Sequence, residues 1–369
     1  MPSVLFTAST FSHIVSFHLP YLRRFRELGW QVDVACGGAM RDIPFADAVM
    51  ALPLEKKISA PSNFRAAALL RRRMEQEQYD LVVTHTTLAA FFTRWAMRGM
   101  RTRPRVVDVV HGYLFDDGTQ GLKKLLLTEA ERMTAPQTDL LLTMNAWDTQ
   151  WAAAHHAAPR VEEIPGMGVD LSRFQAAGEK RQAMRERLGL AEQDVALIYP
   201  AEFGPRKDQA TLLRAMPLLP ERVKLLLPGR GELLDQCRQQ AAALGVADRV
   251  IFPEFVHNIP EWLAAADISV ASSWKEGLPF HVMEAMASGL PAVVTAIKGH
   301  TDLVGPENGL LVPCRDEKAF AAAIQKLADQ PELRARLGEA GRQKVQRYGL
   351  EAVLPQVMER YLSVLNGGK

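Results

Sequence analysis

Short apolar runs alternate with amphipathic helical patterns along most of the chain. Residues 3–9 (SVLFTAS) are apolar at most positions, and residues 13–28 then carry leucine and phenylalanine at helical spacing. Gly29 follows where a helix C-cap is expected, and the next apolar run, QVDVAC, begins at Gln31. Strands that are apolar on both faces and separated by helices form parallel sheets covered on both sides. The pattern therefore predicts an α/β protein.

Each half of the chain repeats this alternation, and a stretch rich in proline, glycine and polar residues separates the halves at 157–180. Further apolar runs occur at 80–85, 105–112 and 139–145 in the first half, and at 195–201, 223–229, 249–255, 267–273 and 291–296 in the second. We therefore expect two Rossmann-like domains, 1–170 and 171–349, whose parallel sheets face each other across a cleft. A C-terminal helix at 350–369 is expected to pack back on the first domain. Sheets of this kind bind ligands at the carboxyl ends of their strands.

The composition is that of an ordinary globular protein and excludes several classes. Of the 369 residues, 48% are hydrophobic and 23% are charged, which excludes a disordered chain. The net charge of +2 is too small for a protein that coats nucleic acid. The three cysteines lie far apart, which argues against a zinc cluster or a disulfide framework and favours the reducing cytoplasm. No segment has the pattern of a signal peptide or a membrane-spanning helix.

One segment, from Lys56 to Arg105, is strongly basic. It contains 11 lysines and arginines and three acids, so its net charge is +8 and that of the remainder is −6. Large apolar residues are interleaved with the basic ones: Phe91, Phe92, Trp95 and Met97. Such a surface suits an anionic membrane, which would make the protein peripheral on the inner face of the plasma membrane; the alternative is that these are the solvated faces of two helices. No nucleic-acid-binding motif accompanies the charge, so nucleic acid is not expected as a partner.

The most informative motif is SSWKEGLPFHVMEAMASGLPAVVTA, at 272–296. It begins where an apolar run ends, Gly277 and Pro279 predict a turn, and residues 281–288 have a helical pattern. The first backbone N–H groups of a helix have no acceptor within it, and the helix dipole adds partial positive charge there. An anionic ligand is therefore expected at this helix start.

Two glutamates in this motif can face the carboxyl edge of the sheet together. Glu276 lies in the turn, and Glu284 lies eight positions later, in the helix. Because carboxylates accept hydrogen bonds, the pair could bind the paired hydroxyls of a sugar ring and of a ribose. The alternative is that Glu276 caps the helix and Glu284 is solvated.

The motif resembles the signature of the family 4 glycosyltransferases, which have the GT-B fold of two facing Rossmann-like domains. In that signature two glutamates flank seven residues, and EAMASGLPAV follows. Four other segments match the family in order and spacing: GVDLSRF (168–174), PGRGELLDQC (228–237), RVIFPEFVHNIPEWLAAADISV (249–270) and ENGLLVP (307–313). The first half of the chain resembles a subgroup of the family that builds capsule, exopolysaccharide or O-antigen chains. The matching segments are SHIVSFHLPYLRRFRELGWQVDVA, APSNFRAAALLRRR, VVHGYLF and LLTMNAWD.

The resemblance implies a retaining, metal-independent glycosyltransferase in bacterial surface polysaccharide synthesis, either a hexosyl- or an N-acetylhexosaminyltransferase. Its C-terminal domain would bind the donor, a nucleotide sugar, with a UDP-sugar favoured. Its N-terminal domain would bind the acceptor, a glycan or a sugar chain on a polyprenyl diphosphate. No cofactor is expected beyond this co-substrate, and no metal ligand is assigned. A nucleotide-sugar epimerase of the same fold, or a non-catalytic scaffold that binds sugar nucleotide or membrane, are the alternatives.

The resemblance also implies roles for residues of the motif. Glu284 would bind the ribose hydroxyls, and Glu276 the hydroxyls of the transferred sugar. Gly277 would lie in the donor-binding turn. The backbone amides of Phe280 and His281 would support the sugar and the diphosphate.

Cations for the diphosphate would come from the loop AEFGPRKDQ, at 201–209. By the same resemblance, Arg206 and Lys207 would neutralise the leaving nucleotide in place of a divalent metal; the alternative is that they are solvated loop charges. Many relatives have Gly-Arg at the start of this loop where this chain has Ala-Glu, so Arg206 would make contacts usually credited to that arginine. Gly229, in a G-x-G after a strand, would lie in a turn close to the nucleotide.

In the first domain the resemblance points to His111, which follows the apolar run RVVDVV. It would lie next to the donor sugar as a hydrogen-bonding group, and a structural role is the alternative. Ser12, His13 and His18 would lie on the acceptor side; for the two histidines, capping and packing roles are the alternatives. Many relatives have a Gly-Gly turn after the first strand, whereas this chain has STFSH there.

Overall fold

The computed structural model describes residues 1–366, and the side chains of all of these except 175 and 176. The chain divides into two compact units: unit 1 comprises Met1–Gly168 and the segment that begins at Glu351, and unit 2 comprises Val169–Leu350. Each unit has one parallel sheet, of seven strands in unit 1 and six in unit 2. The predicted α/β fold with two parallel sheets is therefore confirmed. Of the helix predicted at 350–369, residues 367–369 lie outside the described residues.

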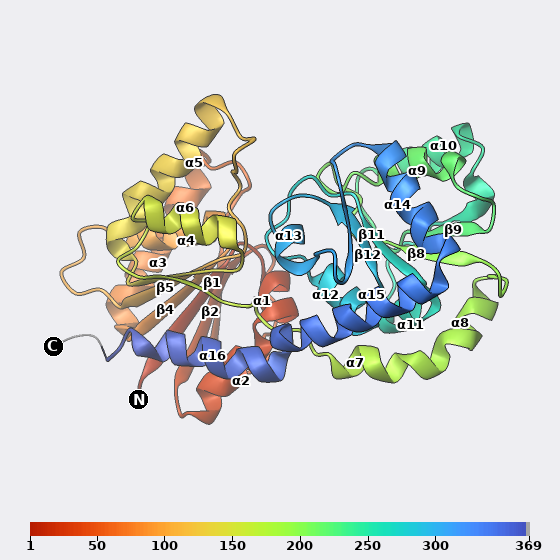
Figure 1. Ribbon diagram of the computed structural model, residues 1–369. Coiled ribbons are helices and arrows are strands. Elements are labelled where there is room, and N and C mark those ends of the chain that lie inside the picture. The colour runs from red at the N-terminus through yellow and green to blue at the C-terminus, as the bar shows by residue number, and fades with distance from the viewer. Residues whose placement is uncertain (367–369) are drawn as a thin grey trace. The chain divides into compact units, whose positions relative to one another are not determined.

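The sheet of unit 1 has the strand order β3-β2-β1-β4-β5-β6-β7. Its strands are β1 (Ser3–Ala8), β2 (Gln31–Gly37), β3 (Ala48–Leu52), β4 (Leu81–His85), β5 (Arg105–Val110), β6 (Leu140–Thr143) and β7 (Val161–Glu163). Its helices are α1 (Phe11–Phe17), α2 (Leu19–Glu27), α3 (Pro61–Glu77), α4 (Thr87–Ala96), α5 (Gly121–Thr134), α6 (Ala146–Ala154) and α16 (Leu350–Ser363). Figure 1 shows α3 to α6 on one face of the sheet and α2 and α16 on the other. Right-handed crossovers that leave β1 in opposite directions place helices on opposite faces in this way.

Aromatic side chains fill the face covered by α2 and α16. Phe6 of β1 packs edge-on against Phe25 and Tyr361, with ring centroids 5.8 and 6.3 Å away. Tyr361 of α16 also stacks on Phe25 at 6.3 Å and is fully buried. The last helix of the chain is therefore part of the core of unit 1.

The prediction of a single helix from 13 to 28 is wrong. The structure has two helices there, α1 and α2, which meet at His18. Pro20 explains the break. A proline has no N–H to continue a helix but fits its first turn, so α2 begins at Leu19 with Pro20 in that turn. At the break, the His18 side chain turns into the interior and has no exposed surface.

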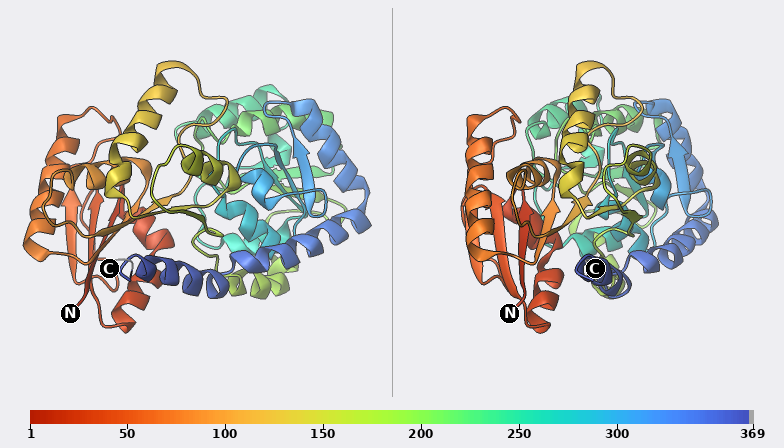
Figure 2. Two further views of the ribbon diagram at one scale, coloured as in Figure 1. Left: turned by 60° about the vertical axis from the view of Figure 1, so that its left-hand side comes forward. Right: turned by 90° about the vertical axis from the view of Figure 1, so that its left-hand side faces the viewer.

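The sheet of unit 2 has the strand order β10-β9-β8-β11-β12-β13. Its strands are β8 (Val195–Ile198), β9 (Val223–Leu226), β10 (Val250–Ile251), β11 (Ile268–Ala271), β12 (Ala292–Thr295) and β13 (Gly309–Val312). Its helices are α7 (Ser172–Gln175), α8 (Arg181–Arg187), α9 (Gln209–Ala215), α10 (Leu234–Ala243), α11 (Ile259–Ala265), α12 (Phe280–Ala287), α13 (His300–Leu303), α14 (Glu317–Asp329) and α15 (Pro331–Lys344). The views of Figure 1 and Figure 2 place α9, α10 and α14 on one face of this sheet and α11, α12 and α15 on the other.

A buried arginine links α4, β5 and α5. Arg94 has no exposed surface, and its guanidinium nitrogens lie 3.0 Å from Oδ2 of Asp108 and 3.0 Å from Oε2 of Glu131. Its Nε donates to the carbonyl oxygen of Ala90 at 3.2 Å, and the hydroxyl of Thr84 donates to Asp108 at 2.7 Å. A buried charge offsets its lost hydration only when it is paired and hydrogen-bonded. These side chains therefore stabilise unit 1 only as a set.

The aromatic part of the surface expected from Lys56 to Arg105 is not present. Three of the interleaved residues are buried in the core of unit 1 and the fourth packs against it: Phe91, Phe92, Met97 and, partly buried, Trp95. Besides Arg94, three arginines of the segment pair with acids from outside it: Arg73 with Asp33, and Arg103 and Arg105 with Asp139. The charge summed along the sequence therefore overstates the charge at the surface.

Replacing Arg94 by methionine should lower the free energy of unfolding by about 3–5 kcal/mol, because it leaves two buried carboxylates without a cation. Arg101→Met, at an exposed residue of the same unit, is the matched control and should change it by less than about 0.5 kcal/mol. Urea titrations followed by circular dichroism measure both values. Equal stability of the two variants would contradict the structural role of Arg94.

Candidate active site

Two loops of unit 2 meet at the carboxyl edge of its sheet. The loop after β8 contributes Lys207 and the loop after β11 contributes Glu276, and these strands are neighbours in the sheet. The Lys207 Nζ atom lies 2.5 Å from Oε1 of Glu276. The hydroxyl of Ser273 donates to the same carboxylate oxygen at 2.6 Å. The sequence-predicted residues Lys207 and Glu276 are thus brought into direct contact.

The charge of Glu276 is stabilised by its neighbours. Burial alone would raise its pKa, but the ammonium of Lys207 and the nearby His281 and His300 lower the pKa to about 2. Behind the pair, the buried hydroxyl of Tyr199 lies 2.6 Å from the Ser273 hydroxyl. Glu276 therefore stays ionised at neutral pH and is available to accept further hydrogen bonds.

Helix α12 begins directly after this loop, with Pro279 at its N-cap. Phe280 and His281 lie in its first turn, where the helix dipole is positive. The loop at Gly277 packs closely against Gly299, since a Cβ atom on Gly299 would lie 2.4 Å from the Gly277 carbonyl oxygen. A side chain at 299 would therefore push away the turn that precedes the helix.

A second carboxylate, that of Glu284, lies one turn into α12. Burial raises its pKa to about 7, against the smaller opposing effect of Arg173. Burial likewise lowers the pKa of His281 to about 3 and that of His300 to about 4, so both imidazoles are neutral at pH 7. Of the four titratable groups, Glu276 is ionised, the two histidines are neutral and Glu284 titrates near neutrality.

Gly229 holds the position of the loop after β8. A Cβ atom there would lie only 1.8 Å from the carbonyl oxygen of Ala201, and one on Gly231 would lie 2.3 Å from that of Phe203. Both glycines are therefore required by packing against the loop that carries Lys207. The neighbouring Arg206 is exposed, and its guanidinium has no acidic partner among residues 1–366.

In unit 1, four imidazoles gather at the carboxyl edge of the sheet: those of His13, His18, His85 and His111. The Nε2 atoms of His13 and His111 lie 3.3 Å apart, and Nδ1 of His85 lies 3.2 Å from Nε2 of His111. His18 stacks on His85, with ring centroids 3.7 Å apart. Burial lowers the pKa of all four, that of His13 to about 4. Three of the four are residues that the sequence singled out.

Ser12, the third residue expected on the acceptor side, is not part of this cluster. Its side chain is exposed and lies 3.0 Å from the hydroxyl of Thr10, which caps α1. Its observed contact is therefore with the residue that caps the helix.

Sequence reasoning missed several residues of these sites. His85 ends β4 as His111 follows β5, and these neighbouring parallel strands end at one edge of the sheet. That spacing was sufficient to predict His85. His300 follows β12 in a comparable way, whereas nothing in the local sequence marks Tyr199 or Ser273.

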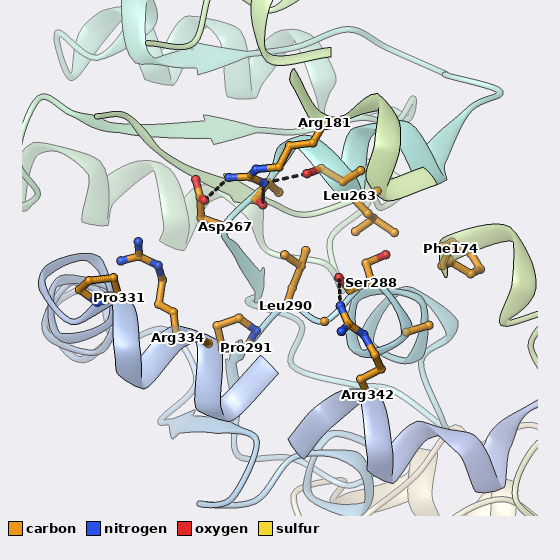
Figure 3. A pocket seen from close by; sticks show the side chains of 16 residues that line it. Phe174, Arg181, Leu263, Asp267, Ser288, Leu290, Pro291, Pro331, Arg334 and Arg342 are labelled. Carbon is orange, nitrogen blue, oxygen red and sulfur yellow. Dashed lines mark hydrogen bonds and ion pairs between the residues drawn. The ribbon is translucent and has the colours of Figure 1, made fainter. Parts of the chain in front are cut away.

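A cavity of about 570 Å³ lies at the opposite edge of the unit 2 sheet, where β11 and β12 begin. Figure 3 shows Arg181, Arg334 and Arg342 around it. Arg181 pairs with Asp267 at 2.6 Å, Arg342 donates to the Ser288 carbonyl oxygen at 3.4 Å, and Arg334 donates to two carbonyl oxygens near the end of α14. These guanidinium groups already have protein acceptors, so we place the chemistry at the carboxyl edge.

Comparison with known proteins agrees with the resemblance in sequence. The model "Glycosyl transferases group 1" matches residues 180–344, and the model "Glycosyltransferase Family 4" matches residues 21–173. EpsD from Bacillus subtilis (strain 168) is 32% identical over 370 residues, which cover 98% of this chain and 97% of EpsD. The chain belongs to the family 4 glycosyltransferases. The predicted family and enzyme class, glycosyltransferase, are therefore confirmed.

Other similar proteins support the same conclusion for this glycosyltransferase. The UDP-Gal:alpha-D-GlcNAc-diphosphoundecaprenol alpha-1,3-galactosyltransferase of Escherichia coli is 27% identical over 288 residues, covering 75% of this chain and 74% of its own. Sucrose-phosphate synthase from Thermosynechococcus elongatus matches in structure with a TM-score of 0.82 at 20% identity, over the full length of both chains. Anabaena HepE in complex with UDP-glucose matches with a TM-score of 0.76 at 20% identity, over 98% of this chain and 100% of HepE. The predicted GT-B fold is confirmed.

Replacing Glu284 by glutamine should stabilise the glycosyltransferase at high pH. Because the native pKa is raised to about 7, ionisation disfavours the native state, and stability is lost as pH rises from about 4.5 through 7. Glu284→Gln removes this loss, so the variant should exceed the parent enzyme by about 2–3 kcal/mol at pH 8 and equal it below pH 4.5.

Urea titrations across pH 4–8 measure this difference in the free energy of unfolding. The matched control is Glu192→Gln, at an exposed glutamate of unit 2, which should stay within about 0.5 kcal/mol throughout. If the difference in the free energy of unfolding between Glu284→Gln and the parent enzyme does not grow with pH, the pKa of Glu284 is not raised in the native state.

Proposed function

We propose that this enzyme transfers a sugar from a UDP-sugar with retention of configuration and without a divalent metal. The observation that carries the proposal is the contact of Lys207 with Glu276, 2.5 Å, at the carboxyl edge of unit 2. A cation and a carboxylate at one point can bind the two halves of a nucleotide sugar, the diphosphate and the sugar hydroxyls. Two similar proteins add support for UDP: HepE has been solved with UDP-glucose, and the E. coli relative is named for UDP-Gal.

The donor would be bound as follows. Lys207 and the exposed Arg206 neutralise the diphosphate. These two side chains take the place of a metal ion as its electrostatic partner. Glu276 accepts hydrogen bonds from the transferred sugar and Glu284 from the ribose. The turn at Gly277 and the first turn of α12, at 280–281, face the sugar and diphosphate with backbone amides, and Gly229 keeps the loop of Lys207 in place.

The reaction is a displacement on one face of the sugar. The acceptor oxygen forms a bond to the anomeric carbon while the bond from that carbon to the diphosphate breaks. The departing phosphate oxygen takes the proton of the acceptor hydroxyl, so no separate base is required. Lys207 stabilises the negative charge that develops on the leaving group.

The acceptor is a glycan or a sugar chain on a polyprenyl diphosphate in polysaccharide synthesis, bound by unit 1. This follows the name of the E. coli relative, which specifies a GlcNAc-diphosphoundecaprenol acceptor. His111 and His13 are only partly buried. Their imidazoles would hydrogen-bond to sugar hydroxyls. Their low pKa values keep them neutral, so each can donate one hydrogen bond and accept one.

The reaction can be tested with purified enzyme, a panel of UDP-sugars and a lipid-linked acceptor extract. UDP release that requires the acceptor supports transfer. Isomerised sugar without acceptor would identify a nucleotide-sugar epimerase instead, and absence of release with every donor would indicate a non-catalytic scaffold. A rate that is unchanged by EDTA supports the absence of a metal in the reaction.

Lys207→Ala and Glu276→Gln should each lower kcat on the order of 10²- to 10³-fold, because each removes a group that stabilises the transition state. Lys326→Ala is the matched control, at an exposed lysine of α14 in the same unit, and should retain full activity. Acceptor-dependent UDP release measures all three. Full activity of either site variant would overturn the assignment of the site.

We also propose that the enzyme contacts an anionic membrane through α5 and not through the segment 56–105. Leu122, Leu125 and Leu126 are 69%, 55% and 61% exposed and lie on one side of this helix. Lys123 and Lys124 lie between them. Within residues 1–366 every helix is too short or too polar to cross a membrane, so the contact would be peripheral.

The position of α5 suits such a contact. Its other side is fixed by buried Ala130 and Thr134 and by the ion pair of Glu131 with Arg94, so the leucines cannot turn inward. Figure 1 shows the helix projecting from unit 1. Exposed leucines beside lysines gain both apolar burial and attraction to anionic headgroups at a membrane surface.

Replacing the three leucines together by serine should weaken binding to anionic vesicles on the order of 10- to 100-fold, because less apolar surface is buried. Sedimentation with vesicles of phosphatidylglycerol and phosphatidylcholine measures this. The control Arg71→Gln/Arg72→Gln changes the basic segment instead and should leave binding within about twofold. Weaker vesicle binding by the arginine variant, with unchanged binding by the leucine variant, would contradict the role of α5. It would indicate that the segment 56–105 is the membrane surface.

A further inference from the structure

The four imidazoles of unit 1 converge from separate parts of its sequence. His13 lies in α1, His18 lies between α1 and α2, His85 ends β4 and His111 follows β5. One ring nitrogen of each lies within 4.8 Å of those of the other three. These residues do not form a sequence motif. They lie close together because β1, β4 and β5 are neighbours in the sheet.

The distances between the nitrogens are those of metal ligands. Two ligands of a tetrahedral zinc ion, each at about 2.0–2.1 Å from the metal, lie about 3.3–3.4 Å from each other. In unit 1, Nε2 of His111 lies 3.3 Å from Nε2 of His13 and 3.2 Å from Nδ1 of His85. Both separations therefore match those of ligands that share one ion, and the ligand nitrogens of all four histidines lie within 4.8 Å of one another.

Hydrogen bonds among the histidines do not satisfy the cluster. A single atom, Nε2 of His111, faces both His13 and His85, and a neutral ring nitrogen either donates one hydrogen bond or accepts one. Both nitrogens of His18 and Nε2 of His85 are buried, and they have no hydrogen-bond partner in the described part of the chain. Burying such groups without a partner is unfavourable. An ion that accepts a lone pair from His18 would therefore stabilise unit 1.

We propose that His13, His18, His85 and His111 bind one first-row divalent transition-metal ion, of which Zn²⁺ and Co²⁺ are suitable probes. Imidazole is a preferred ligand of these ions. The second histidine cluster among the described residues, Glu276 with His281 and His300, is less suited, because the Glu276 carboxylate already pairs with the ammonium of Lys207. The site lies in unit 1, whereas the donor chemistry is proposed for unit 2.

An occupied site would affect the reaction in a definite way. The ion would use the nitrogen of His111 that the proposed function gives to a sugar hydroxyl, and this consequence rests on that function. Saturating Zn²⁺ should therefore inhibit transfer, and chelation should restore it. Metal binding itself is measured without any sugar substrate, so its outcome is independent of the proposed reaction.

The test is titration of the full-length, metal-stripped enzyme with Co²⁺ and Zn²⁺. We expect one ion per chain by calorimetry and the visible absorption of four-coordinate, nitrogen-ligated Co²⁺. His13→Gln and His85→Gln should each weaken binding by at least about 100-fold, more than the loss of an outer-sphere contact. Circular dichroism establishes that each variant is folded, and the less buried His13 provides the second variant if His85→Gln does not fold.

His257→Gln and His155→Gln, at exposed histidines, are the matched controls and should leave Co²⁺ binding unchanged. Absence of a bound ion, or binding that is the same in His13→Gln and in these controls, would overturn the proposal. Octahedral Co²⁺ absorption without loss in the cluster variants would indicate adventitious surface binding and would also overturn it.

Discussion

Adjacent parallel strands end at the same edge of a sheet, and each group of functional side chains depends on that constraint. In unit 2 it brings the loops after β8 and β11 together, so Lys207 contacts Glu276 although 68 positions lie between them in the sequence. In unit 1 it brings together His85 and His111, which follow the neighbouring strands β4 and β5. The chemistry is carried by short loops whose ends are fixed by buried strands, as is expected for open α/β sheets.

The two edges differ in their electrostatics. Unit 2 keeps a charged pair at its edge, and its two carboxylates differ in pKa. Burial raises the pKa of Glu284 to about 7, whereas the ammonium of Lys207 and two nearby histidines lower that of Glu276 to about 2 despite its burial. Unit 1 has neutral imidazoles at its edge, and its buried charges lie deeper, where Arg94 pairs with Asp108 and Glu131. Ligands that bind to the first edge meet formal charges, and ligands that bind to the second meet lone pairs and N–H groups. This difference is the physical basis for placing an anionic donor in unit 2 and a polyhydroxylated acceptor or a metal ion in unit 1.

Most strands could be predicted from the sequence because parallel strands buried on both faces are continuous apolar runs. The short strands at the sheet edges, such as β3 and β7, lack that pattern and were not found. The surface charge of the basic segment was overestimated because charge was summed along the chain, whereas the acids that pair with Arg94 and Arg103 come from other parts of the sequence. The exposed side of α5 was not predicted either. Leucines at helical spacing give the same sequence pattern whether they face the core or the solvent.

For the glycines after β9, the sequence motif predicts the position of a tight turn but not the whole reason why glycine is needed there. A G-x-G after a strand suggests backbone close to a phosphate. In this enzyme a side chain at Gly229 would already collide with the carbonyl oxygen of Ala201, at 1.8 Å, before any nucleotide binds. The glycine is therefore required to let the loop that carries Lys207 lie against the turn after β9. Because that loop also supports Glu276, the packing of two backbones fixes the distance between the cation and the carboxylate, and with it the geometry in which a sugar and its leaving group can be bound together.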